Sequence, residues 1–125
     1  MITTDFEKLV HVIGTRSVYL ATPYTDPKAL IMERRTERAN DLTGRLMEKG
    51  VIVFNPIGQG VAAERALGRA IDPKLHYEHG LRMVDAMDMT VVMMQPGWEK
   101  SHEVKNDVRR AQAADKEVIY YGDWT

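Results

Sequence analysis

Four short apolar runs, separated by longer amphipathic stretches, dominate the pattern of hydrophobic and polar positions along the chain. The runs are rich in valine, isoleucine and aromatic residues, which favour strands, and polar turn residues or prolines bound several of them. They are largely continuous rather than alternating, which is typical of parallel strands that are covered on both faces. We therefore predict buried strands over residues 17–22, 51–54, 88–94 and 117–121.

The longest stretch between the runs, residues 28–49, has apolar residues at helical spacing. The spacing places Leu30 and Met47 near one face with the other apolar residues of this stretch. Arg35 belongs to the opposite side, whose mixed charges are typical of a solvated helix surface. Gly50 follows in the position expected of a helix C-cap.

A shorter amphipathic pattern over residues 3–13 predicts a helix capped by Thr3 or Thr4. Residues 57–72 contain three glycines and are interpreted as a loop with one short helix. Further helices are predicted over residues 61–67, 73–87 and 101–115.

Strands that alternate with helices indicate βαβ units and a parallel sheet. We predict an α/β fold: a small three-layer, flavodoxin-like or Rossmann-like sheet of about four to five strands with helices on both faces. With the predicted strands numbered along the chain, the expected order is 2-1-3-4, so a topological switch lies between the first and the third. The loops 21–27 and 95–101 should then flank one crevice, where open parallel sheets bind ligands. One domain, 1–125, is expected, with 1–16 as an N-terminal helical extension.

Composition and charge exclude several kinds of partner and chemistry but do not indicate a function. The 125 residues suit one domain with a real core, 44% of them hydrophobic and 28% charged. The net charge of −1 gives no reason to expect nucleic acid or an anionic membrane as a partner. The absence of cysteine excludes disulfides and thiol catalysis and suits a cytoplasmic protein. No apolar stretch approaches the roughly 18 residues of a membrane-spanning helix.

The residues around the second predicted loop carry the best candidate chemistry. Ser101 opens a predicted helix, and its hydroxyl with the first helix amides offers an anion site favoured by the helix dipole. Asp107 follows within two turns of the same predicted helix. Ser101 could equally be an ordinary N-cap, and Asp107 could pair with Arg110 on a wet helix face.

Metal and dinucleotide sites are not indicated. His76 and His79 are three residues apart and lack the four-residue spacing of a zinc-protease helix, and no third ligand is evident. Gly58, Gly60 and Gly68 do not form a dinucleotide fingerprint. We therefore expect no cofactor and no metal.

Four segments in order resemble motifs of the nucleoside 2-deoxyribosyltransferase superfamily, and together they cover roughly residues 17–121. The nearest branch is the uncharacterised DUF1937 family, whose pattern Gly-Trp-Glu-x-Ser-x-Gly-Val is similar to the segment that begins at Gly97. The four segments are Val18–Tyr24, Gly50–Ile57, Asp85–Met93 and Gly97–Ser101, the last continued by Val104, Asp107 and Ala111.

The resemblance implies a protein that cleaves or exchanges N-glycosidic bonds of nucleosides or nucleotides and often forms dimers or larger homo-oligomers. Asp107 would be its catalytic carboxylate, and Ser101 would hold the phosphate of a nucleoside 5'-monophosphate. Tyr24 and Trp98 would wall the pocket. The substrate contacts that we expect are Tyr19, Ala21, Pro23, Tyr24, Asn55, His79, Asp88, Trp98, Ser101 and Glu103.

Two positions depart from the superfamily's pattern. Glu103 replaces a glycine and brings an anion to the place where a phosphate is expected, and Asp107 replaces a glutamate and is shorter by one methylene. Both departures weaken the inference of catalysis. The alternative is a non-catalytic nucleotide-binding or sensing module, or a structural oligomeric module, of the same fold.

Overall fold

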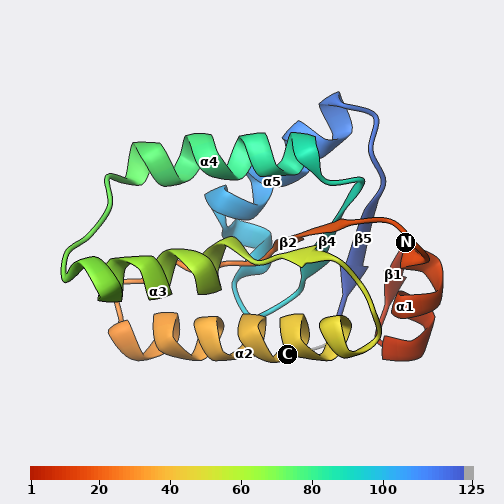
Figure 1. Cartoon of the computed structure of the whole chain (residues 1–125), viewed down its shortest axis with the longest axis horizontal. Coiled ribbons are helices and arrows are strands. Elements are labelled where there is room, and N and C mark those ends of the chain that lie inside the picture. The colour runs from red at the N-terminus through yellow and green to blue at the C-terminus, as the bar shows by residue number, and fades with distance from the viewer. Residues whose placement is uncertain (123–125) are drawn as a thin grey trace.

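A parallel sheet lies between two layers of helices in the computed structural model, which describes residues 1–122 (Figure 1). All neighbouring strands are parallel, in the order β1-β5-β4-β2-β3. The predicted α/β class is therefore confirmed. The strands are β1 (Ile2–Thr3), β2 (Val18–Ala21), β3 (Val53–Phe54), β4 (Met89–Met93) and β5 (Val118–Tyr121).

The predicted order of four strands is also confirmed, because β3, β2, β4 and β5 are neighbours in that sequence. The register between β2 and β4 pairs Val18 with Met89 and Ala21 with Val92, so these two strands end side by side. A fifth strand, β1, extends the sheet beyond β5. It belongs to the part of the chain that we had predicted to be only a helical extension.

The helices alternate with the strands, and most begin at a side-chain cap. Asp5 caps the first helix by accepting from the Lys8 amide, so the predicted capping by Thr3 or Thr4 is wrong. Thr3 instead pairs with β5. The helices are α1 (Phe6–Ile13), α2 (Ala29–Glu48), α3 (Pro56–Leu67), α4 (Pro73–Ala86), the 3-10 helix η1 (Trp98–Lys100) and α5 (His102–Ala113).

The third helix, α3, is longer than the sequence indicated, because it begins at Pro56 rather than Val61. Asn55 accepts from the amide of Gly58 and caps the helix, and proline suits the first helical position. Two glycines in the first turns had suggested a loop. The Asn55 cap and the restricted φ of Pro56 therefore allow the helix to begin here despite the two glycines.

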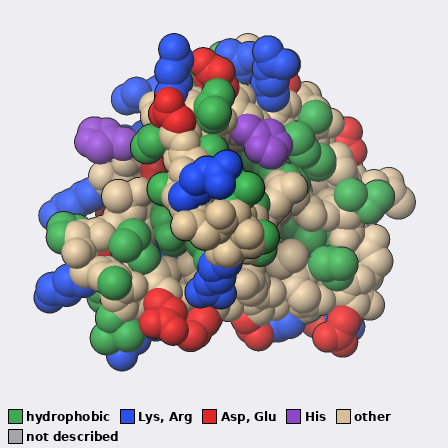
Figure 2. All heavy atoms as spheres, turned by 60° about the vertical axis from the view of Figure 1, so that its left-hand side comes forward, with side chains coloured by type: hydrophobic (Ala, Val, Ile, Leu, Met, Phe, Trp, Pro, Cys, Tyr) green, Lys and Arg blue, Asp and Glu red, His purple; other side chains and the backbone are tan. Residues whose placement is uncertain are grey.

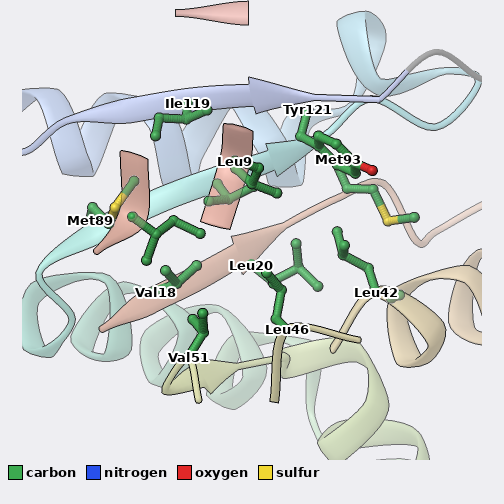
Figure 3. Packing of buried hydrophobic residues seen from close by; sticks show 13 residues of the cluster. Leu9, Val18, Leu20, Leu42, Leu46, Val51, Met89, Met93, Ile119 and Tyr121 are labelled. Carbon is green, nitrogen blue, oxygen red and sulfur yellow. The ribbon is translucent and has the colours of Figure 1, made fainter. Parts of the chain in front are cut away.

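Two hydrophobic clusters fill the spaces on either side of the sheet. One joins the sheet to α1 and α2, and Figure 3 shows Leu20 of β2 close to Leu42 and Leu46 of α2. The other joins the sheet to α4 and α5 through Val84 and Val104, among others. Complete burial of a leucine stabilises a fold by about 1.5–3 kcal/mol, so these clusters fix both helical layers.

The buried face of α2 differs from the predicted one. Leu30 and Met47 are 56% and 62% exposed, whereas Arg35 is only 9% exposed. The buried side follows Arg35, Ala39, Leu42 and Leu46, at spacings of four, three and four residues. The prediction placed the buried face wrongly because it assumed that an arginine must face water.

Arg35 is buried because backbone carbonyls from two loops satisfy its guanidinium. One terminal nitrogen donates to the carbonyls of Tyr24 at 3.3 Å and Thr25 at 3.0 Å, and the other donates to the carbonyl of Pro96 at 3.0 Å. These carbonyls belong to the loops that follow β2 and β4. Arg35 therefore holds together the two loops at the carboxyl edge of the sheet.

Gly97 makes room for this arrangement, and its replacement gives a direct test. Its φ of +95° is unfavourable for other residues, and a Cβ there would lie 2.6 Å from a terminal nitrogen of Arg35. We expect Gly97→Ala to lower the free energy of unfolding by more than about 1 kcal/mol. Gly44→Ala is the matched control, because a Cβ at this α2 position meets no atom within 4 Å and alanine should raise the stability by about 1 kcal/mol. Urea unfolding followed by circular dichroism measures both, and an unchanged stability of Gly97→Ala would contradict the proposed role of Arg35.

Candidate functional site

A cavity of about 490 Å³ opens between the loops that follow β2 and β4. This is the crevice expected at the topological switch, and the structure confirms its position. Pro23, Thr25 and Arg35 line one side of it, and Lys100, Ser101 and Glu103 line the other.

A second cavity of about 360 Å³ lies between α3 and α4. Its wall includes Phe54 at the end of β3, Gln59 of α3, and His76, His79 and Gly80 of α4. Figure 2 brings this end of the molecule forward and shows histidine and basic side chains interspersed with apolar ones. The second cavity therefore combines aromatic walls with groups that can donate hydrogen bonds.

Tyr19 and Asp107 form the central pair of the site. Tyr19 is buried in β2, and its hydroxyl lies close enough to the carboxyl group of Asp107 on α5 for each group to shift the pKa of the other. The tyrosine ring lies 6.0 Å from the ring of Phe54, which in turn lies 5.6 Å from that of His79. The pair is therefore linked to the cavity between α3 and α4 by a row of aromatic rings.

Gly80 leaves space for the tyrosine hydroxyl. A Cβ at Gly80 would lie 3.1 Å from that oxygen, which is closer than ordinary van der Waals contact. The glycine on α4 therefore helps to set the position from which Tyr19 reaches Asp107.

The surroundings of this pair change the acidity of both groups. Burial raises the pKa of Asp107 to about 7, and the nearby Glu103 carboxylate contributes in the same direction, although the bond from Tyr19 opposes the shift. Burial, followed by the charge of Asp107, raises the pKa of Tyr19 well above its ordinary value. Tyr19 therefore stays protonated and can donate, while Asp107 can gain or lose a proton near neutral pH.

Glu103 makes contacts that bind it to the loop after β2. Its Oε1 accepts from the amides of Tyr24 at 3.3 Å and Thr25 at 3.1 Å, and its Oε2 accepts from the Thr25 hydroxyl at 3.3 Å. The first turn of α5 and the loop after β2 are thus connected through one carboxylate.

Tyr24 lies near acidic groups from two helices. Burial raises its pKa, and the negative charges of Glu64 on α3 and Glu103 on α5 add to the shift. Glu64 itself accepts from the amide of Ile71 at 2.7 Å and lies 3.2 Å from the Nε2 of His76. These two bonds lower the pKa of Glu64, so it remains a carboxylate at the edge of the second cavity.

The structure brings most of the predicted site residues to this region. Ser101 both borders the crevice and caps α5 by accepting from the Val104 amide at 3.2 Å. The alternative pairing of Asp107 with Arg110 is wrong, since Arg110 binds both oxygens of Asp85 at 2.8 and 2.6 Å. Tyr19 and Asp107 line neither cavity. The predicted residues found at the carboxyl edge or in the cavities are Ala21, Pro23, Tyr24, His79, Ser101 and Glu103.

Asp88 and Asn55 have other roles in the structure. Asp88 precedes β4, at the edge of the sheet opposite to the crevice, and accepts from the Ser17 amide at 2.8 Å. Asn55 is buried as the cap of α3, and its amide group donates to the side-chain oxygen of Asn40 at 2.9 Å. Neither side chain is brought to the Tyr19–Asp107 pair.

Trp98 also lies apart from the crevice. Its ring is 5.5 Å from that of Tyr120, and it packs against the cluster between the sheet and α5. The sequence had correctly placed Trp98 near the loop after β4, but the 3-10 helix turns its ring toward β5 rather than toward Tyr24.

Three residues of this region were missed by the sequence analysis. Arg35 was assigned to a solvated face, and Glu64 lay in the short helix predicted over residues 61–67 without any role. Phe54 was predicted as the end of a strand, which could have indicated a position at the carboxyl edge. Within residues 1–122, no group of three histidine, aspartate or glutamate side chains is arranged to hold a metal ion, and no helix is long and apolar enough to cross a membrane.

The raised pKa of Asp107 predicts a pH-dependent effect on stability. Its folded-state pKa of about 7 exceeds the unfolded value of about 3.9, so the stabilisation is complete below the unfolded value and is lost as the pH rises through 7. Asp107→Asn should therefore raise the free energy of unfolding at pH 8, on the order of 1–4 kcal/mol, and change it little at pH 4. Urea titrations at the two pH values measure the difference. An equal effect at both would contradict the shift, and Asp115→Asn in the exposed turn after α5 is the control.

The comparisons with known proteins concern the same part of the chain. No curated protein matches it. The sequence model described as "Domain of unknown function (DUF1937)" matches residues 16–123, which include β2 to β5 and both cavities. Since this match covers most of the 125 residues, the chain belongs to the DUF1937 family.

Proposed function

We propose that this protein cleaves or transfers the N-glycosidic bond of a nucleoside or of its 5'-monophosphate. The observation that carries the proposal is the Tyr19–Asp107 pair, in which a half-buried carboxyl group is held by a tyrosine hydroxyl beside a cavity with aromatic walls. The resemblance of the chain to nucleoside 2-deoxyribosyltransferases supports the same chemistry. The DUF1937 family itself carries no assigned activity in its description.

The chemistry requires a carboxylate next to the anomeric carbon of the sugar. Ionised Asp107 attacks that carbon, or stabilises the oxocarbenium-like cation, while the bond to the base breaks and its electron pair leaves with the base nitrogen. The leaving base takes a proton from an acid, and His79 in the cavity wall is the candidate donor. Water, or a second base in a transferase, then takes the sugar from Asp107.

Tyr19 serves as a positioning residue in this proposal. Its hydroxyl can donate to one carboxyl oxygen of Asp107 and leave the other for the substrate. The ring of Phe54 offers a flat surface for a nucleobase in the cavity between α3 and α4. The base and the carboxylate would thus be held by different elements of the fold.

A second candidate is a module that binds nucleosides without cleaving them. The short carboxylate of Asp107 and its pKa of about 7, which leaves about half of it protonated at neutral pH, favour this reading. Such a protein would be stabilised by a ligand without releasing its base.

Base release from a panel of nucleosides and 5'-monophosphates tests the proposal directly. We expect chromatography to detect free base with the wild-type protein and a loss of about 100-fold or more with Asp107→Asn. Asp115→Asn should retain the rate. Ligand-induced thermal stabilisation without any base release would support the binding module instead and reject the enzyme.

The pH dependence of this activity tests the role of Asp107. A nucleophilic carboxylate must be ionised, so the rate should rise with pH as Asp107 ionises near pH 7, and it should fall at higher pH once the acid that protonates the leaving base has lost its proton. The bond from Tyr19 lowers the pKa of Asp107, so Tyr19→Phe should move this rise to higher pH. Tyr120→Phe, which removes a hydroxyl on the same side of the sheet, should leave the profile unchanged. A rise at the same pH in the wild type and in Tyr19→Phe would contradict the role of Asp107 as nucleophile.

A further inference from the structure

Glu103 occupies a group of donors that could otherwise bind a free anion. Two successive amides, of Tyr24 and Thr25, and the Thr25 hydroxyl converge on its carboxylate at 3.1–3.3 Å. Backbone amides that point into one concavity are a recurrent way of binding phosphate. We refer to these three donors as the loop anion site.

Arg35 keeps the loop anion site in place from the other side. It binds the carbonyls of Tyr24 and Thr25, the same two residues whose amides bind Glu103. The orientation of the amides therefore does not depend on Glu103 alone. With the carbonyls held, the donors are already arranged for an anion when the glutamate is removed.

The position of the loop anion site relates it to the proposed reaction. Glu103 stands four residues before Asp107, so both project from the same side of α5, with Cβ atoms about 5–6 Å apart. This separation is comparable with that between the anomeric carbon of a sugar and its 5'-substituent. A sugar that presents its anomeric carbon to Asp107 can thus direct its 5' end toward Glu103.

We infer that Glu103 is a specificity residue that selects substrates without a 5'-phosphate, because its carboxylate occupies the loop anion site. This inference rests on the proposed function, and it decides between the two substrate forms that the proposed function leaves open. A phosphate must displace a carboxylate that is covalently part of the same protein and therefore competes at a high effective concentration. An uncharged 5'-hydroxyl meets no such repulsion and can donate a hydrogen bond to the carboxylate.

Binding of inorganic phosphate tests the role of Glu103 without requiring any catalytic activity. We expect calorimetry at constant ionic strength to show that phosphate binds Glu103→Ala at least about tenfold more tightly than the wild type. Glu103→Gln, which keeps the length but not the charge, should give an intermediate affinity. Glu99→Gln removes the same charge from the exposed 3-10 helix before α5 and should bind phosphate like the wild type.

Paired substrates complete the test. The ratio of the dissociation constants of a 2'-deoxynucleoside 5'-monophosphate and the corresponding nucleoside should favour the nucleoside in the wild type and fall by about tenfold or more in Glu103→Ala. Circular dichroism shows whether each variant is folded, and Glu103→Gln serves if Glu103→Ala is not.

The outcomes distinguish the inference about Glu103 from the proposed enzymatic function. Equal phosphate affinities in the wild type and both folded Glu103 variants would overturn the inference, as would a wild-type preference for monophosphates. Tighter phosphate binding by the Glu103 variants, with no base released by any protein, would support the blocked loop anion site and reject the proposed enzyme.

Discussion

The guanidinium of Arg35 is the interaction on which the carboxyl edge of the sheet depends. A buried arginine is tolerated only where its donors are satisfied, and here backbone carbonyls from the loops after β2 and β4 supply the acceptors. The hydrophobic clusters hold the strands and helices, but they include none of the residues of the loop after β2 that line the crevice. A single long side chain thus extends the order of the core into irregular backbone, and the crevice, the loop anion site and Glu103 all depend on that order.

The sequence predicts the parallel sheet well because each central strand is a largely continuous apolar run of sufficient length. It does not predict β1, since a strand of two residues has no periodicity and exists only through its pairing with β5. Arg35 is misplaced for a similar reason: its partners are carbonyls of loops that no helical pattern contains. Local pattern describes the elements, whereas these features arise from contacts between distant segments.

The residues of the candidate site show the same difference between what local pattern predicts and what contacts between distant segments determine. The resemblance identifies Tyr19 and Asp107 separately, and the structure shows why two residues so far apart in sequence belong to one unit. Asp88 and Asn55 also lie in matching motifs, yet one is at the opposite edge of the sheet and the other caps α3. Position in a motif therefore does not reveal which edge or face a side chain occupies. The backbone donors of Tyr24 and Thr25 have no sequence pattern at all, since every residue except proline carries such an amide.

The cavity between α3 and α4 has a consequence for how this protein can change over evolution. Tyr19 and Asp107 are carried by β2 and α5, whereas Gln59 and Gly60 of the cavity wall belong to α3. None of the residues of α3 is fully buried, so substitutions there disturb the packing of the domain little, except at Gly58, where a Cβ would meet the side chains of Asn40 and Asn55. The lining of the cavity can therefore diversify among relatives while the carboxyl group and its tyrosine remain in place, which makes α3 the part of the chain most open to adaptive change.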